Sequence, residues 1–230
     1  MDKLTQKQIS ILKISATMVI ACALMYIVEE AIQPSYLIKT LIKLVLFIGL
    51  PWFVYRSDHI IHFKDCWKLW SAKQIFWSIG LGMIVYGFIV GGYFLIASHI
   101  DLQQIQMQLS GSLQITKKNF MLIATYIALA NSLIEEFFFR GFGYLSLKRV
   151  IHSKIATVFS SLLFAAYHVS IMSSWFSMGI FLLFIFGLFL SGLLFNWFNE
   201  KFQNIYGSWI IHMFANFALN TIGFILFGII

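Results

Sequence analysis

Charged side chains are scarce in this chain. Only 11% of its 230 residues are Asp, Glu, Lys or Arg, and 60% are hydrophobic. A typical soluble domain carries about 25% charged residues. So few charges cannot cover the surface of a water-soluble protein of this size. The composition therefore excludes a soluble globular protein and predicts a single integral membrane domain over residues 1–230.

Cysteine is rare as well, and two common hydrolase motifs are missing. Cys22 lies in an apolar run and Cys66 in a basic loop, so the two cysteines indicate neither a disulfide framework nor a metal motif. The sequence contains no His-Glu-x-x-His and no Gly-x-Ser-x-Gly. The usual zinc-protease and serine-hydrolase motifs are thereby excluded.

The net charge of +7 does not indicate a nucleic-acid partner. The basic residues cluster at the ends of apolar segments, where they set membrane orientation and meet anionic lipid. We therefore expect membrane lipid, and no nucleic acid, among the partners of this chain.

Long, continuous apolar runs dominate the sequence. They predict an all-α, polytopic transmembrane bundle with about seven membrane segments, because a β-barrel would need short alternating segments instead. A break near Asn220 or Gly223 would add an eighth element. The seven segments are Ile9–Val28, Leu37–Tyr55, Ile75–Ala97, Phe120–Leu147, Ile155–Met172, Met178–Phe198 and Tyr206–Phe227.

The positive-inside rule places the N-terminus in the cytoplasm of a multi-pass protein of the cell membrane. Basic clusters precede the first segment, follow the second and follow the fourth, on one side of a seven-span protein. Lys117 and Lys118 fall on the other side. The first apolar run continues past Ala21, so we expect an uncleaved first helix rather than a signal peptide. Lys39 and Lys43, near one end of the second segment, are expected to reach the interface.

Two adjacent glutamates and an arginine lie deep in the fourth segment. Charged groups in the middle of a membrane helix are costly and usually have a partner and a task. Glu136 and Arg140 are four residues apart and can pair on one helix face. Glu135 is rotated about 100° from Glu136 and would lack that partner. Glu135 is therefore a candidate general base.

Two histidines and an asparagine complete the set of polar residues in the late segments. His168 ends the run Phe164-Ala165-Ala166-Tyr167, and His212 precedes Asn216 by one helical turn. A carboxylate with two histidines suits either a metal site or a water-activating site. If a metal such as zinc is present, its ligands would be Glu135, His168 and His212.

The depth of these residues presents a difficulty. Counting along the segments puts His212 in the cytoplasmic half, His168 toward the outer half and Glu135 near the middle. A tilted helix, a broken helix or different segment boundaries would be needed to bring the three side chains together.

The order and spacing of these motifs resemble the CAAX-protease and bacteriocin-processing (CPBP, or Abi) family, which includes the type II CAAX prenyl endopeptidases. The matching motifs are Glu135-Glu136-x-x-x-Arg140, Phe164-x-x-x-His168 and His212-x-x-x-Asn216. The likeness covers about residues 120–220, which would form the catalytic core, and the short chain looks like a bacterial member.

The resemblance implies an intramembrane endopeptidase whose substrate is a peptide or a membrane protein. By the match, Glu135 and His168 would activate a water, His212 and Asn216 would stabilise the oxyanion, and Glu136 and Arg140 would order the site. Members have been described both as metalloproteases and as glutamate proteases. We favour metal-independent glutamate chemistry, with no bound cofactor, because the site offers no cysteine and no third histidine.

Similar proteins suggest a role in bacteriocin self-immunity or in processing a precursor peptide; a prenylated substrate fits a short bacterial-looking chain less well. A second possibility is a non-proteolytic membrane scaffold or immunity protein of the same fold. A third is an ion-coupled transporter, since buried Glu, Arg and His also mark ion paths. The sequence has no matching pair of broken helices in two halves, which disfavours the transporter.

Overall fold

The computed structural model describes residues 3–111, 114–172 and 175–230. It is 83% helical and has no strands in this described part, which confirms the all-α class. Among the described residues, six helices are long and apolar enough to cross a membrane, and Ser153–Tyr167 is a shorter apolar helix. The six candidate spans are Leu4–Ile32, Tyr36–Ser57, Ala72–His99, Phe120–Leu145, Met178–Phe202 and Tyr206–Leu226.

Several spans contain more than one helical element. In chain order the elements are α1 (Lys3–Ile27), η1 (Val28–Ile32), α2 (Tyr36–Leu44), η2 (Val45–Gly49), α3 (Leu50–Ser57), η3 (Phe63–Cys66), α4 (Ala72–Ile96), η4 (Ala97–His99), α5 (Leu102–Gly111), α6 (Phe120–Tyr126), η5 (Ile127–Asn131), α7 (Ser132–Glu136), η6 (Phe137–Leu145), α8 (Ser153–Tyr167), α9 (Val169–Met172), α10 (Met178–Phe202) and α11 (Tyr206–Leu226).

Two expectations about the segments need correction. The predicted fifth segment, Ile155–Met172, is not one helix, because α8 ends at Tyr167 and α9 is separate. With 15 residues, α8 is about 22 Å long, which is shorter than a bilayer core of about 30 Å. The last segment does not break near Asn220 or Gly223, since α11 runs without interruption to Leu226.

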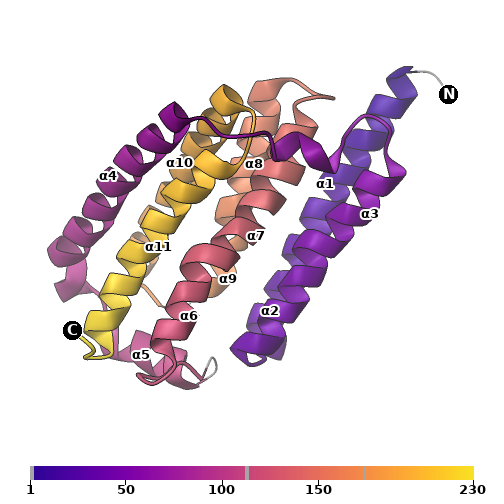
Figure 1. Ribbon diagram of the computed structural model, residues 1–230. Coiled ribbons are helices and arrows are strands. Elements are labelled where there is room, and N and C mark those ends of the chain that lie inside the picture. The colour runs from indigo at the N-terminus through magenta and orange to yellow at the C-terminus, as the bar shows by residue number, and fades with distance from the viewer. Residues whose placement is uncertain (1–2, 112–113, 173–174) are drawn as a thin grey trace.

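The helices form a bundle with the residues of α6, α7 and α8 in its middle. Figure 1 shows α1, α2 and α3 at one edge and α4 with α11 at the other. The N-terminus and the C-terminus lie at opposite ends of the bundle (Figure 1). An odd number of crossings has this arrangement, and α8 would then be a short seventh passage beside the six candidate spans.

Wider π-helical turns interrupt three of the spans. They are η1, η2, η5 and η6, and the last two flank α7 on either side. A π turn inserts an extra residue into the hydrogen-bond ladder and shifts the side chains that follow it around the helix axis. Such turns occur frequently at functional sites. Here η5 ends directly before α7 and so affects the direction in which α7 presents its two glutamates.

Glycines allow two helix pairs to approach closely. A Cβ atom on Gly192 of α10 would lie 2.9 Å from the Cα atom of Ser161 on α8. A Cβ atom on Gly82 of α4 would lie 2.5 Å from the ring of Phe214 on α11. Small residues at such contacts are typical of membrane helix packing, where close van der Waals contact replaces the hydrophobic effect.

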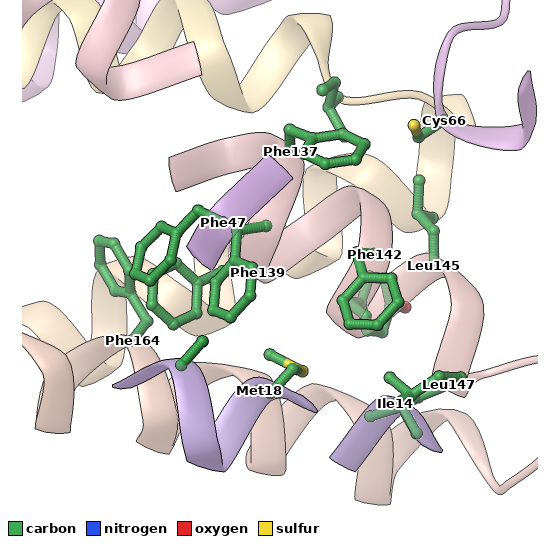
Figure 2. Packing of buried hydrophobic residues seen from close by; sticks show 14 of the residues in the cluster. Ile14, Met18, Phe47, Cys66, Phe137, Phe139, Phe142, Leu145, Leu147 and Phe164 are labelled. Carbon is green, nitrogen blue, oxygen red and sulfur yellow. The ribbon is translucent and has the colours of Figure 1, made fainter. Parts of the chain in front are cut away.

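A cluster of phenylalanines packs the centre of the bundle around α7 and η6. Phe47 of η2 stacks on Phe138, with ring centroids 4.0 Å apart and an interplanar angle of 8°. Phe139 meets Phe164 of α8 edge to face at 5.3 Å. Figure 2 shows Phe47, Phe139 and Phe164 gathered between the helices. Aromatic pairs of this kind add to the burial energy and hold η2, η6 and α8 in fixed positions.

Cys22 and Cys66 are both buried.

Candidate active site

Glu135 lies at the centre of the bundle and is only 3% exposed. Its two carboxylate oxygens have different neighbours. Oε1 accepts a hydrogen bond from Lys43 Nζ at 2.8 Å and another from Asn131 Nδ2 at 3.0 Å. Oε2 faces two histidine rings instead. One oxygen is therefore held by two donors, and the other is directed toward the groups that could take part in chemistry.

The interfacial position expected for Lys43 from the sequence is wrong. It does not reach the membrane interface, because its side chain is buried against Glu135. Its Nζ also donates to Asn131 Oδ1 at 2.7 Å and lies 5.0 Å from the ring centroid of Tyr167. Glu135 thus has a cationic partner, contrary to expectation. The one signal in the sequence was a lysine inside an apolar run, for which an interfacial position was the simpler explanation.

His168 follows the last residue of α8, and the structure brings it close to Glu135 despite the depth difference that the sequence indicates. Its Nδ1 donates to the carbonyl oxygen of Phe164 at 2.8 Å. A carbonyl can only accept, so Nδ1 carries the proton in the neutral ring and Nε2 presents a lone pair. Nε2 lies 3.9 Å from Glu135 Oε2. The side chain is 15% exposed, which makes it more accessible than either glutamate.

His212 of α11 joins the two glutamates. Its Nδ1 lies 3.0 Å from Glu136 Oε1, and its Nε2 lies 3.7 Å from Glu135 Oε2. An ionised carboxylate can only accept, so Nδ1 donates to Glu136, and Nε2 of the neutral ring carries a lone pair. The ring of Phe195 on α10 stacks against His212 at 5.6 Å and fixes its plane.

The expected pair of Glu136 and Arg140 is present. Arg140 Nη1 lies 3.3 Å from Glu136 Oε1, and neither side chain is exposed. The Arg140 guanidinium carbon lies 4.0 Å from the ring centroid of Phe164 and 4.8 Å from that of Phe195. Cation–π contact of this kind offsets part of the cost of burying the charge. The positive charge of Arg140 therefore balances the negative charge of Glu136, and Glu136 in turn orients the ring of His212.

Asn216 lies on α11 and is buried, but its contacts differ from those of His212. Its Nδ2 donates to the carbonyl oxygen of Ile127 at 3.2 Å. Within the described residues, no hydrogen bond joins Asn216 to either glutamate. The second N–H of this amide is the one that remains for a ligand.

The geometry favours a shared water molecule over direct contact. Glu135 Oε2 is 3.7 and 3.9 Å from the two Nε2 atoms, too far for a direct hydrogen bond. A single water could lie about 2.8 Å from Oε2 and from one of the two Nε2 atoms and donate one hydrogen bond to each, because it has two O–H groups. The arrangement can therefore bind a water, accept a proton from it and return that proton.

The same residues fit a metal ion less well. Among the residues that the structure describes, no group of three or more His, Cys, Asp or Glu side chains is arranged to hold one. In addition, Lys43 already places a positive charge 2.8 Å from Glu135, and a second cation on that carboxylate would be repelled. The ligand set offered by the sequence, Glu135, His168 and His212, does not form a metal site here.

One comparison with known proteins gives a match. Residues 117–218 match the family model "Type II CAAX prenyl endopeptidase Rce1-like". This stretch is therefore an Rce1-like domain of the CPBP family, a family of membrane proteases. No curated protein and no solved structure matches the chain. Lys43 lies outside the matched residues, whereas Glu135, His168 and His212 lie within them.

Proposed function

Because residues 117–218 form an Rce1-like domain, we propose that this protein is an intramembrane endopeptidase that hydrolyses a peptide bond with a water activated by Glu135 and His168. One observation carries the proposal. Oε2 of Glu135 and the Nε2 atoms of His168 and His212 converge, at 3.7–3.9 Å, within the domain. The remaining residues between 1 and 230 would complete one membrane domain around this core.

The chemistry begins with a proton transfer. The proposed water gives a proton to Glu135, or to the lone pair of His168, while its oxygen attacks the carbonyl carbon of the scissile bond. The tetrahedral intermediate then collapses as the C–N bond breaks, and the stored proton passes to the leaving amine. Atoms balance, because one water is consumed and two new termini are formed.

His212 and Asn216 are proposed to stabilise the oxyanion, each in its own way. His212 donates from Nε2 only in its protonated form: it takes up a proton from solvent before the water attacks and returns that proton to solvent after the intermediate collapses. The adjacent Glu136 carboxylate stabilises that imidazolium. Asn216 donates through its second amide N–H. Oriented donors in a site shielded from water stabilise developing charge strongly. Arg140 lies 3.3 Å from Glu136 and holds it in place for this task.

The substrate is proposed to be a peptide or a membrane-protein segment that reaches the site at or within the bilayer. The burial of Glu135 supports this, because the carboxylate is far from bulk water. Bacteriocin self-immunity and processing of a precursor peptide are roles compatible with such an activity. A non-proteolytic scaffold of the same fold is the alternative that the experiment below must exclude.

The test is cleavage of a quenched-fluorescent peptide library by the purified protein in detergent. We expect Glu135→Gln to lower kcat by at least about 100-fold, the usual contribution of a general base. His168→Ala should lower it similarly. Glu30→Gln, the same chemical change at the end of the first span, is the matched control and should leave kcat unchanged.

The same assay, run with and without a chelator, tests whether cleavage requires a metal ion. We expect EDTA or phenanthroline to leave the wild-type rate unchanged. A rate that falls with chelator and returns with added zinc would contradict metal-independent chemistry. Equal cleavage by wild type and Glu135→Gln would indicate a contaminating protease, and no mutant-sensitive product even in native membranes would favour the scaffold.

A further inference from the structure

The structure brings a residue of the N-terminal helices into the centre of the Rce1-like domain. Lys43 of α2 and Glu135 of α7 are 92 positions apart in the chain, yet their charged groups lie 2.8 Å apart. Neither the motifs nor the matched stretch includes Lys43. A buried lysine with a short contact to the proposed base requires a role of its own.

We propose that Lys43 is a positioning residue for Glu135: its ammonium group holds Oε1, turns Oε2 toward the two histidines and keeps the carboxylate ionised. The catalytic part of this proposal rests on the proposed function. The part that concerns the charge state and orientation of Glu135 does not rest on it, so the two parts are tested separately.

The hydrogen bonds around Oε1 form a closed set. Lys43 Nζ donates to both Glu135 Oε1 and Asn131 Oδ1, and Asn131 Nδ2 donates to the same Oε1. Each of the three side chains therefore constrains the other two. With Oε1 held by two donors, rotation of the carboxyl group is restricted, and Oε2 stays on the side of His168 and His212. A base held in this way needs less reorganisation before it reacts.

The charge of Lys43 matters because the surroundings are apolar. A lone carboxylate in a low-dielectric interior tends to take up a proton, and a cation within hydrogen-bonding distance favours the ionised form. Lys43 is the only Lys or Arg with a described ion pair to Glu135. The titratable and charged groups that interact electrostatically with Glu135 are Lys43 and Tyr36 from α2, Arg140 from η6, Tyr167 from α8, His168 after α8, His212 from α11, Tyr126 from α6 and Cys22 from α1.

The neighbouring lysine provides a matched control. Lys39 lies one turn before Lys43 on the same helix, and it forms its ion pair with Glu29 of η1 instead. Both lysines are largely buried and both are paired with a glutamate. They differ in which glutamate they hold. A change at Lys39 therefore reproduces the loss of a buried lysine without touching Glu135.

The first test is kinetic and separates kcat from KM. We expect Lys43→Met to lower kcat by about 10- to 100-fold with little change in KM, because a base held loosely still allows the substrate to bind. The acid limb of its pH–rate profile should move to higher pH. Lys39→Met should retain the wild-type kcat and profile. Unchanged kcat in Lys43→Met would overturn the catalytic part of the proposal.

The second test does not depend on proteolysis. Hydrophobic carbodiimides modify a buried carboxyl group when it is protonated, and mass spectrometry of peptides containing Glu135 measures the extent. At neutral pH we expect slow labelling in wild type and in Lys39→Met, and labelling at least several-fold faster in Lys43→Met. Lys43→Arg, which keeps the charge, should stay as slow as wild type.

A failure of the proposed function and a failure of the inference about Lys43 give different results in the two tests. If wild type cleaves nothing, the proposed function fails, but the labelling rates still decide whether Lys43 governs the charge state of Glu135. Equal labelling in wild type and Lys43→Met would overturn the inference. Fast labelling in Lys43→Arg would overturn it too, and would do so even if Lys43→Met failed to fold.

Discussion

Glu135 and Glu136 are neighbours in the chain, but they have different partners. Glu135 is held by Lys43 and faces two histidines, whereas Glu136 is paired with Arg140 and accepts a hydrogen bond from His212. The difference arises because successive helical residues point about 100° apart. Two carboxylates in different surroundings can serve different tasks. In the proposed mechanism Glu135 moves the proton and Glu136 orients His212.

The pair of Glu136 and Arg140 leads to a prediction about stability. Arg140→Met removes the cation and leaves Glu136 buried without its partner. Breaking a buried ion pair from one side costs about 3–5 kcal/mol. We therefore expect a clearly lower melting temperature of the protein in detergent, measured by the change in intrinsic fluorescence on heating.

A double variant provides the control. Arg140→Met with Glu136→Gln removes both charges, and most of the lost stability should return because no unpaired charge remains. Wild-type stability in the Arg140→Met single variant would show that the pair contributes nothing to the fold.

The short helix α8 determines where His168 lies. The helix ends at Tyr167, and His168 caps it with its ring held by the Phe164 carbonyl. The close approach of α10 at Gly192 fixes α8 from the other side. The position of the histidine thus depends on the packing of two helices.

That dependence predicts different outcomes for two glycines of α10. A Cβ atom at Gly192 would lie 2.9 Å from the backbone of α8, so Gly192→Ala should separate the helices and cost about 1–3 kcal/mol. Gly187→Ala is the matched control, because nothing lies within 4 Å of a Cβ atom there. It should be neutral or slightly stabilising, by up to about 1 kcal/mol.

Thermal unfolding of the two variants in the same detergent makes the comparison. We also expect cleavage activity to fall in Gly192→Ala, since His168 moves with α8. Equal melting temperatures for the two variants would show that the α8–α10 contact can relax without cost.

Across the whole molecule, the termini and the basic loops define an orientation. The ends of the chain lie at opposite ends of the bundle (Figure 1). The basic residues in the first turns of α1 and those after α3 and η6 would share one side of the membrane. We propose that this side is the cytoplasm, as the positive-inside rule requires. The site would then lie between the two membrane surfaces, accessible to a substrate in the bilayer.

Reporter fusions in a bacterial host test this orientation. We expect a fluorescent protein fused to the N-terminus to fold and fluoresce, and alkaline phosphatase fused to the C-terminus to be active outside. A fusion in the loop at residues 148–152 should behave as cytoplasmic and serves as an internal control. Active phosphatase at both ends would contradict an odd number of crossings.

The sequence by itself determined the class of the fold and most of the candidate site residues. Long apolar runs require helices in a bilayer, because every backbone polar group must find its partner within the segment. Polar residues in such runs are costly, so Glu135, Glu136, Arg140, His168, His212 and Asn216 stood out without any structure. The Glu136–Arg140 pair was predictable because helical periodicity is local.

Only the tertiary structure decided which of these residues meet and what else meets them. The end of α8 at Tyr167, the unbroken α11 and the contact between Lys43 and Glu135 all depend on packing between distant segments. A lysine one or two turns into a helix can reach outward to the interface or inward to a carboxylate. The spacing of residues within the helix is the same for an outward and an inward lysine. The inward direction of Lys43 therefore depends on the position of α7 beside α2.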